Sequence, residues 1–548
     1  MTCPTCHLEV AAGDDECPRC GTLLASWTGA QREESPWSRP PSDEPTLAFA
    51  SPAEYAATHP VPPAAPAPGF AAAGSPPPPA WTLPQPPVRK RRLALPVLVL
   101  ALALLVTGGG VAAAGYYLGW FGGGRGPAEV VPGTAVSYLQ VDLDPSLVQK
   151  ASAWQFLRDL PQVKEAVASG RPDPKAIAWK LLAVPGTPLE DVDYARDVQP
   201  WLGDRFAVAA VPRQAGGAGG LFAVQVRDEA KAAAALRDWA GRTGQAWDVT
   251  IRDGYALLTE PADTRAFLGQ LDAGPLSSNA TVTADLATLG DPGVAAGWID
   301  LAAAARLAED APAGPVQGRA VVSLGFTADT MTFGGRLIGL GETGLTGAAD
   351  LGALPASTWA GLGFADGGSA VEKLFPTMEA YLRDWLTEAG LDEADLAALL
   401  GRSFSVGLSS SDTAAEGGMP EVGLRIETDD VARARAALEK LVGPPEGGLP
   451  VTSRVEGDVL FAATSAPYLG ELASPPATLG TDPAFVKALP DHARASFSLF
   501  VNPVPVLRLT GWSGGENAEF VGALRGIGAE YVAEGPGSGS WAFRVVRD

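Results

Sequence analysis

The feature that most constrains this chain is an uncharged run from Leu93 to Trp120, LALPVLVLALALLVTGGGVAAAGYYLGW. The run is longer than the roughly 20 apolar residues that an α-helix needs to cross the hydrocarbon core of a membrane. A helix of this length inside a soluble domain would normally present a polar face to water. The run therefore predicts a single transmembrane helix over residues 93–120.

The residues that flank this run predict its orientation. A basic cluster, Arg89–Arg92, precedes it, and Tyr116, Tyr117 and Trp120 lie near its other end, where aromatic residues meet the membrane interface. Basic residues favour the cytoplasmic side, so we expect a cytoplasmic N-terminus and an extracytoplasmic C-terminal part. A signal peptide has the same order of basic and apolar regions, but it normally begins within the first few residues of a chain. We therefore predict a single-pass protein of the cell membrane.

All four cysteines of the chain lie within its first 20 residues, as two Cys-Pro-x-Cys pairs. The pairs are Cys3 with Cys6 and Cys17 with Cys20. Four thiolates at this spacing suit one tetrahedral zinc ion. A module of this size has no useful apolar core, so metal binding would supply its folding free energy. Residues 1–24 therefore predict a zinc ribbon with one structural zinc ion, similar to the short ribbons that open many bacterial membrane proteins.

Other chemistry at the cysteines stays open. Because His7 follows Cys6, the first pair also reads C-x-x-C-H, the attachment pattern of a c-type haem. Covalent haem attachment belongs to the outer side of the membrane, whereas the predicted topology places this end in the cytoplasm. A dithiol redox pair and an iron–sulfur cluster are the remaining alternatives.

Residues 25–92 are crowded with prolines, including the run Pro76–Pro79, and they show little periodicity. Such a composition buries too little apolar surface to offset the entropy of ordering, so it predicts a disordered, partly polyproline linker that ends in the basic cluster. The formal charge of the whole chain is −22. Because phosphate binding needs clustered Lys and Arg, this charge argues against a nucleic-acid partner.

The part after the predicted helix contains an internal repeat. A first unit over residues 129–345 and a second over 352–548 show similar segments in the same order, beginning with VPGTAVSYLQVDLD from Val131 and LPASTWAGLGFADG from Leu354. The segments IRDGYALLTE and RVEGDVLFAAT each predict a hairpin, in which Gly254 and Gly457 supply the turn. The repeat predicts two tandem copies of one folding unit.

Tight turns join several strand pairs inside each copy, which favours antiparallel pairing. The predicted fold class is therefore α+β: two tandem copies of a mixed, largely antiparallel sheet-plus-helices unit, with a small zinc ribbon and a single transmembrane helix. The polar and acidic residues that open two helices predict N-terminal caps rather than a metal site: Asp228 with Glu229, and Thr428 with Asp429 and Asp430.

Three segments of the outer part carry a family resemblance: PGTAVSYLQVDLDPS, FLRDLPQV and DVQPWLGDRFAVAAVP. They resemble the bacterial domain-of-unknown-function family 3352, over nearly the whole outer part. The resemblance implies an envelope-exposed domain, often behind a single transmembrane helix. It implies no established activity and no catalytic residues.

Catalytic motifs are scarce outside the membrane. The outer part has no cysteine and one histidine, His492, so a Ser-His-Asp triad would have to use it. No G-x-S-x-G motif supplies a serine, and we expect His492 to be exposed in a polar turn before a strand at Ser496–Val501. The Gly-rich segments 216–220 and 535–541 lack the Lys-Ser/Thr ending of a phosphate loop and predict hairpin connections.

Five tryptophans on apolar segments are predicted to belong to the core, with a ligand cleft between the two units as the alternative: Trp154, Trp179, Trp201, Trp239 and Trp298. No catalytic or cofactor-binding residue is predicted outside the zinc ribbon. The sequence thus favours a non-enzymatic protein that binds or scaffolds in the cell envelope, with an envelope ligand or a protein as partner. The alternatives are a carboxylate-based wall-glycan hydrolase and a zinc- or redox-responsive transmembrane sensor.

Overall fold

The computed structural model describes residues 126–548 except 169–172, 174, 177–178, 180–191, 244–245, 308–315, 342–345, 370, 372–382, 384–385, 410–419, 443–450, 511–514 and 516–517. The described residues belong to one compact unit, Lys90–Asp548. The predicted zinc ribbon (1–24), linker (25–92) and transmembrane helix (93–120) lie outside the described residues. Across the described stretches, no helix is both long and apolar enough to cross a membrane.

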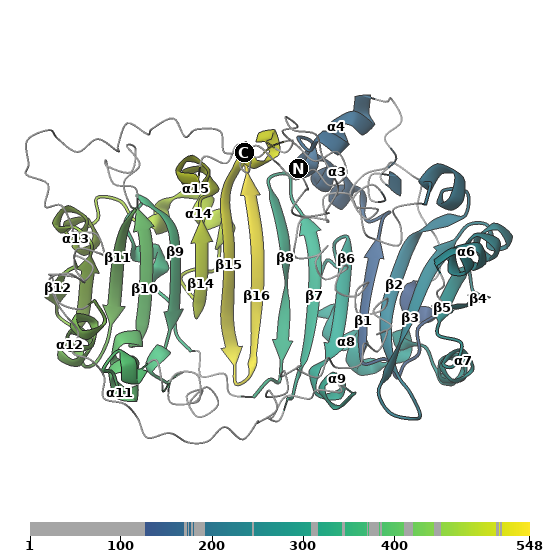
Figure 1. The fold of residues 1–548 in the computed structure, drawn as a ribbon, viewed down its shortest axis with the longest axis horizontal. Coiled ribbons are helices and arrows are strands. Elements are labelled where there is room, and N and C mark those ends of the chain that lie inside the picture. The colour runs from purple at the N-terminus through teal and green to yellow at the C-terminus, as the bar shows by residue number, and fades with distance from the viewer. Residues whose placement is uncertain are drawn as a thin grey trace, which may run out of the picture. The chain divides into compact units, whose positions relative to one another are not determined.

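Sixteen strands form one antiparallel sheet (Figure 1). The first eight are β1 (Ser137–Asp142), β2 (Leu202–Pro212), β3 (Ala218–Val226), β4 (Asp248–Arg252), β5 (Tyr255–Thr259), β6 (Ala295–Asp300), β7 (Arg319–Phe326) and β8 (Thr330–Ile338). The second eight are β9 (Thr358–Ala365), β10 (Ser403–Ser409), β11 (Glu421–Glu427), β12 (Thr452–Glu456), β13 (Val459–Ala463), β14 (Phe497–Val501), β15 (Leu524–Gly535) and β16 (Ser538–Arg547). The predicted α+β class with antiparallel pairing is confirmed.

The two sets of eight strands follow one order. From the outer edge inward, the first set runs β4-β5-β3-β2-β1-β6-β7-β8 and the second runs β12-β13-β11-β10-β9-β14-β15-β16. The innermost strands, β8 and β16, are equivalent and pair antiparallel, with Gly334 opposite Ala542 near the middle. Antiparallel pairing of equivalent strands relates the two halves by an approximate two-fold axis. The two halves therefore share one continuous sheet.

Small details repeat as well. Pro132 bridges Pro275 in the first half, and Pro355 bridges Thr478 in the second. Next to each bridge a backbone N–H donates to a carbonyl at 2.7 Å, from Leu276 to Val131 and from Leu479 to Leu354.

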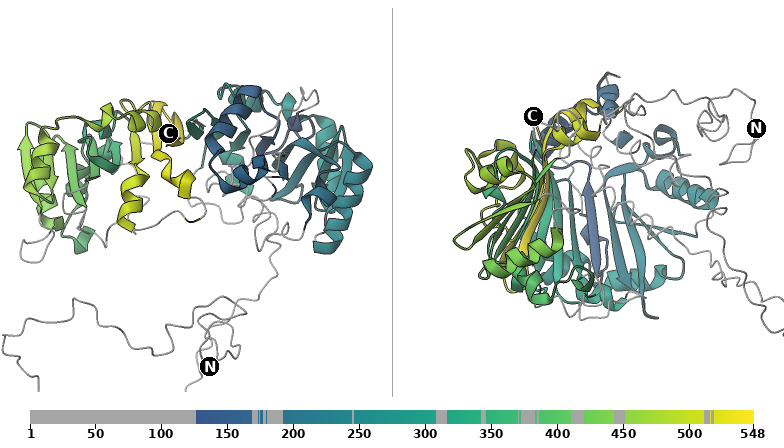
Figure 2. Two further views of the ribbon diagram at one scale, coloured as in Figure 1. Left: turned by 90° about the horizontal axis from the view of Figure 1, so that it is seen from above. Right: turned by 60° about the vertical axis from the view of Figure 1, so that its left-hand side comes forward.

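Helices lie between the strands in a similar order in both halves. Those of the first half are η3 (Pro127–Glu129), α3 (Leu147–Leu157), α4 (Pro161–Ala168), the π-helix η4 (Tyr194–Val198), α6 (Glu229–Thr243), α7 (Thr264–Ala273), η5 (Leu276–Ser278), α8 (Ala280–Ala287) and α9 (Leu301–Leu307). Those of the second half are η6 (Leu351–Ala353), α11 (Glu393–Leu400), α12 (Val431–Val442), α13 (Ala466–Ala473), η8 (Leu479–Thr481), α14 (Pro483–Ala488), α15 (Pro503–Thr510) and α16 (Ala518–Gly522). Figure 2 shows helices on both sides of the sheet.

The local signals in the sequence act where they were expected. The side chain of Asp228 accepts a hydrogen bond from the backbone of Lys231 at 3.0 Å, and Asp430 accepts one from Arg433 at 2.9 Å, so the predicted caps of α6 and α12 are confirmed. Gly254 and Gly457 adopt φ of 77° and 63° in the predicted hairpins.

Directly opposed residues of neighbouring strands lie on the same face of a sheet, so the register defines two faces. The face that carries Tyr138 and Phe500 is called face A here. It is covered by α7, η5 and α8 in the first half and by α13, η8 and α14 in the second. The opposite face, face B, is covered by α3 and α6 in the first half and by α11 and α12 in the second.

Candidate functional site

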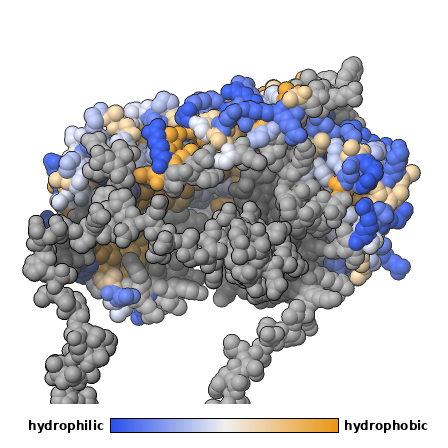
Figure 3. Space-filling model, turned by 45° about the horizontal axis from the view of Figure 1, so that its top comes forward, coloured by the Kyte–Doolittle hydropathy of each residue, from blue (hydrophilic) through white to orange (hydrophobic). Residues whose placement is uncertain are grey.

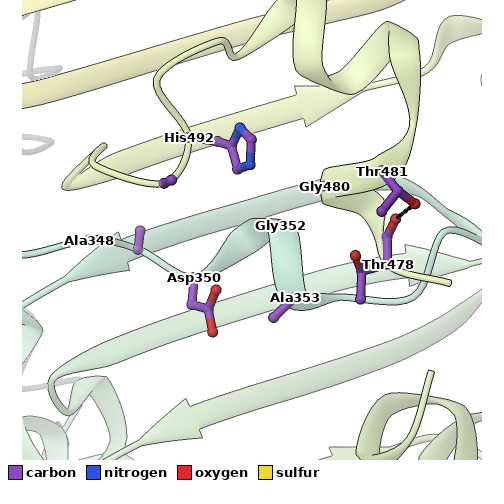
Figure 4. A pocket seen from close by; sticks show the side chains of 10 residues that line it. Ala348, Asp350, Gly352, Ala353, Thr478, Gly480, Thr481 and His492 are labelled. Carbon is purple, nitrogen blue, oxygen red and sulfur yellow. Dashed lines mark hydrogen bonds between the residues drawn. The ribbon is translucent and has the colours of Figure 1, made fainter.

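A pocket of about 340 Å³ opens on the face A side of the second half (Figure 4). It lies between η6, η8 and the turn before β14. Its lining residues are Ala348, Ala349, Asp350, Gly352, Ala353, Thr478, Gly480, Thr481, His492 and Ala493. It thus contains the histidine that the sequence singled out.

His492 lies in the predicted turn before β14, but the expectation that it is exposed is wrong. Its side chain is partly buried, and its ring packs edge-on against Phe485 with 5.1 Å between ring centres. Its Nδ1 lies 2.9 Å from the carbonyl oxygen of Leu489. Because a carbonyl oxygen only accepts, Nδ1 carries the hydrogen in the neutral ring and Nε2 presents a lone pair.

Two glycines form the wall beside this ring. A Cβ atom on Gly352 would lie 2.9 Å from Cδ2 of His492, and one on Gly480 would lie 3.4 Å from its Nε2. The backbones of η6 and η8 therefore pack directly against the imidazole. Packing of this kind holds the ring in place.

Two other polar groups of the pocket, the carboxylate of Asp350 and the hydroxyl of Thr481, have protein partners. One carboxylate oxygen of Asp350 lies 3.0 Å from Nη1 of Arg425 on β11, and Figure 4 shows this carboxylate pointing away from His492. The Thr481 hydroxyl donates to the carbonyl of Thr478 at 2.7 Å. The pocket therefore does not bring an imidazole, a carboxylate and a hydroxyl to one reacting centre, as nucleophilic catalysis requires.

Four carboxylates are buried in the described structure, and each has a basic partner: Asp263 with Arg213, Asp285 with Arg319, Asp395 with Arg433 and Lys440, and Glu530 with Arg544. Lys440 and Arg433 lower the pKa of Asp395. Burial raises the pKa of Glu530, and Arg544 opposes that effect. A glycosidase needs two carboxylates that face one substrate across a cleft, and these four are instead each paired with a cation.

The buried face of the central sheet carries small and polar residues. On face A, Ser405, Gly363, Ser498 and Glu530 lie side by side on β10, β9, β14 and β15. Ser405 and Ser498 have no exposed surface, and Glu530 is 4% exposed.

Close packing of the covering segments explains the glycines of face A. A Cβ atom on Gly528 would lie 2.7 Å from the carbonyl oxygen of Ala488 in α14, and one on Gly363 would lie 3.4 Å from Cβ of Ala349. At Gly528, only hydrogen lets α14 approach the strand this closely.

Face B of the same strands has the opposite composition. Its middle row runs across six adjacent strands as Val406, Leu362, Leu499, Ala529, Phe543 and Phe333. The neighbouring rows add Phe404, Leu408, Ala360, Phe364, Phe497, Val501, Ile527, Tyr531, Trp541, Val545 and Met331. These residues, from β10, β9, β14, β15, β16 and β8, are called the apolar strip, and none of them is ionisable at neutral pH.

Every residue of the apolar strip is partly exposed, whereas the intervening face A residues of β9, β10, β14 and β15 are buried. Figure 1 shows β15, β16 and β8 with no labelled helix across most of their length. Figure 3 shows hydrophobic residues gathered in a hollow below a rim of hydrophilic ones. The more exposed side of the central sheet is therefore its apolar side.

The tryptophans predicted to lie in the core do pack there. Trp201 and Trp298 are each 6% exposed, and Trp154, Trp179 and Trp239 pack, partly buried, against the clusters that α3 and α6 cover. None of the five lines the pocket or belongs to the apolar strip. The Gly-rich segments 216–220 and 535–541 lie at the β2–β3 and β15–β16 hairpins, as predicted.

The apolar strip was not predicted, although the sequence contains a signal for it. In β15 the residues Ile527, Ala529 and Tyr531 alternate with Gly526, Gly528 and Glu530. Alternation alone marks the apolar residues as the buried side, and the structure shows the reverse. The predicted zinc ligands Cys3, Cys6, Cys17 and Cys20 lie outside the described residues, and within the described residues no group of three or more His, Cys, Asp or Glu could hold a metal ion.

One family model matches part of this chain, and the other comparisons with known proteins carry no argument. The search of curated proteins found no match. A solved structure titled "Structure of crystal form I of TP0453" aligns over 65% of this chain and 98% of its own, with 10% identity and a TM-score of 0.14, which is too low to support any argument. Residues 98–279 match the family described as "Protein of unknown function (DUF3352)", which confirms the resemblance over that part of the chain, up to η5 of the first half.

Proposed function

We propose that this chain is a single-pass membrane protein of the cell envelope whose outer domain binds an apolar partner through the apolar strip, without chemical change. One observation carries the proposal: on β9, β10, β14 and β15, most of the large apolar side chains lie on the more exposed face, whereas the buried face consists mainly of Gly, Ala and Ser and includes the large apolar side chain of Phe500.

This arrangement has a cost in water. Each Å² of apolar surface left exposed forgoes about 25 cal/mol of hydrophobic stabilisation. Contiguous exposed apolar patches of several hundred Å² mark interaction sites in soluble proteins. A partner that covers the strip would recover this free energy, so the strip is suited to binding.

The remaining parts of the proposal rest on the sequence. The helix over residues 93–120 would anchor the domain, the basic cluster would keep the N-terminus in the cytoplasm, and four cysteines would hold one zinc ion there. The equal strand order of the two halves supports repeat units over residues 129–345 and 352–548.

Binding of an apolar fluorescent probe tests the role of the strip. The full chain in mild detergent should bind 1-anilinonaphthalene-8-sulfonate, and Phe543→Gln should weaken that binding several-fold. The matched control is Leu441→Gln, because Leu441 is 41% exposed on α12 and lies outside the strip. Equal binding by both variants would show that the strip is not the binding surface.

The zinc site is tested separately. The purified full chain should contain one zinc ion per chain, and Cys17→Ser should remove it while leaving probe binding unchanged. Retention of the metal by this variant would contradict the predicted ligand set.

A further inference from the structure

We infer that the apolar strip holds the acyl chain of a membrane lipid, an inference that rests on the proposed function and names the ligand class.

The predicted anchor places the domain close to a lipid surface. It ends at Trp120, and the described structure begins at Gly126. A connection of about six residues spans at most roughly 20 Å, even when it is fully extended. Lipid is therefore an apolar partner that is always within reach of this domain.

The chemistry of the strip fits a hydrocarbon chain better than a protein. Protein partners form about one hydrogen bond per 100–200 Å² of interface. The three rows of the strip offer almost no groups for such bonds, because all but Tyr531 and Trp541 have purely hydrocarbon or thioether side chains. An acyl chain needs no hydrogen bonds along its length.

The size of the strip also fits. Six adjacent strands at roughly 4.8 Å spacing give a row of about 24 Å. An acyl chain spans about half of the roughly 30 Å hydrocarbon core of a bilayer, so one row accommodates it. The two ends of the strip are partly covered, because Met331, Phe333 and Val545 pack against the cluster that α3 covers, and Phe404 packs against the cluster that α12 covers.

One polar group in the strip fits the ester of such a lipid. The hydroxyl oxygen of Tyr531 is buried and has no hydrogen-bond partner in the described structure, so a ligand would have to enter beside the ring to reach it. A Cβ atom on Gly539 would lie 2.7 Å from the Tyr531 ring, so this glycine lets the ring lie across the neighbouring strand. An ester carbonyl at the end of the acyl chain would supply the missing acceptor.

Photocrosslinking in native membranes tests this ligand class. The photoreactive residue p-benzoylphenylalanine, which inserts into C–H bonds, replaces Phe543 in the full chain, and mass spectrometry of the irradiated protein identifies the adduct. Leu499 in the same row is the second position, in case the first variant does not fold. The control position is Val486 on α14, which is 38% exposed and lies outside the strip.

The expected result is an adduct with the mass of a phospholipid at both strip positions, several-fold more abundant than at position 486. An adduct with another polypeptide would overturn the lipid class while leaving the proposed apolar binding intact. An adduct within the same chain, or none, would overturn both, because it would show that the strip is not open to a partner.

Discussion

The two faces of β15 follow opposite rules. On face A, Gly526, Gly528 and Glu530 are buried beneath α14 and the turn that precedes β14. On face B, Ile527, Ala529 and Tyr531 remain partly exposed.

The difference shows that a residue of β15 is buried where the backbone of a covering segment packs closely on the strand, whether or not its side chain is hydrophobic. Face A of β15 is buried because glycines let a covering helix lie directly on the strand, and the ion pair of Glu530 with Arg544 compensates the charge that remains. Face B has the larger side chains, and the described structure leaves them partly exposed. The alternation of small and large residues therefore distinguishes the two faces of β15. The alternation of polar and apolar residues predicts the wrong face to be buried.

The largest expected effect concerns the ion pair of face A. Arg544→Met leaves Glu530 buried without its cation, which should lower the free energy of unfolding by about 3–5 kcal/mol. The urea midpoint of the full chain in mild detergent measures this change. The double variant Glu530→Gln with Arg544→Met should recover most of the loss, and failure to recover it would show that the two side chains are not coupled.

The pH dependence of this variant has a definite sign. Burial raises the pKa of Glu530 above its ordinary value of 4.5. A raised carboxyl pKa gives a contribution to stability that is fully present below the unfolded value and is lost as pH rises through the folded pKa. Arg544→Met removes the cation that opposes this loss, so its destabilisation should grow from pH 4 to pH 8.

A second test compares face B where it is covered with face B where it is open. Leu324→Ala removes a side chain that α3 buries and should cost about 3 kcal/mol. Leu499→Ala removes a side chain of the same type from the strip, and we expect a cost of about 1 kcal/mol, since less apolar surface is buried there. Equal urea midpoints of the two variants would show that both leucines are equally covered, and that face B does not differ between its two regions.

A third test places the same methyl groups on either face of one strand. Gly528→Val would bring its Cβ atom to 2.7 Å from the backbone of Ala488, and we expect a loss of about 1–3 kcal/mol from overpacking. Ala529→Val points toward face B and should change the free energy of unfolding by less than about 0.5 kcal/mol. A large loss at position 529 would mean that face B is as tightly packed as face A.

A fourth test concerns the covered end of face B. Arg547 is 3% exposed and donates to Asp159 and to the carbonyl of Phe156, which ties β16 to α3. Its hydrogen bond lowers the pKa of Asp159 below 3.8. A lowered carboxyl pKa stabilises the fold above the unfolded value and is lost as pH falls through the folded pKa.

Asp159→Asn should therefore cost about 1.5 kcal/mol at pH 7 and less at pH 3, as measured by urea midpoints at both values. Asp482→Asn is the control, because that carboxylate caps α14 and does not contact Arg547. An equal loss of unfolding free energy at pH 3 and pH 7 would show that titration of Asp159 does not contribute to the loss of stability in acid.

Much of the fold was predictable because local signals coincide with it. The hairpins at Gly254 and Gly457, the caps at Asp228 and Asp430, and the antiparallel class all follow from short-range patterns. The junction of β8 with β16 joins residues about 200 positions apart, and the short-range patterns that we used carry no information about that distance. A repeat in the sequence therefore predicted two units, and it gave no sign that their sheets would join.

The candidate site was less predictable. His492 could be located in its turn, but its contact with Leu489 and its two glycine neighbours depend on η6 and η8, which come from other parts of the chain. The apolar strip joins six strands, and no single strand reveals which of its faces is covered. The cysteine pairs remain a prediction.

The pairing of β8 with β16 has a consequence for mass action. Two identical subunits that joined through such an edge would separate on dilution, whereas one chain carries both edges at an effective concentration of the order of millimolar. The pairing of the halves is thus independent of protein concentration. Because one chain contains both halves, the sequence of one half can also diverge without the same substitutions in the other. Arg547 of β16 in the second half also donates to the carbonyl of Phe156 in α3 of the first half, so this contact joins the halves beyond the strand pair.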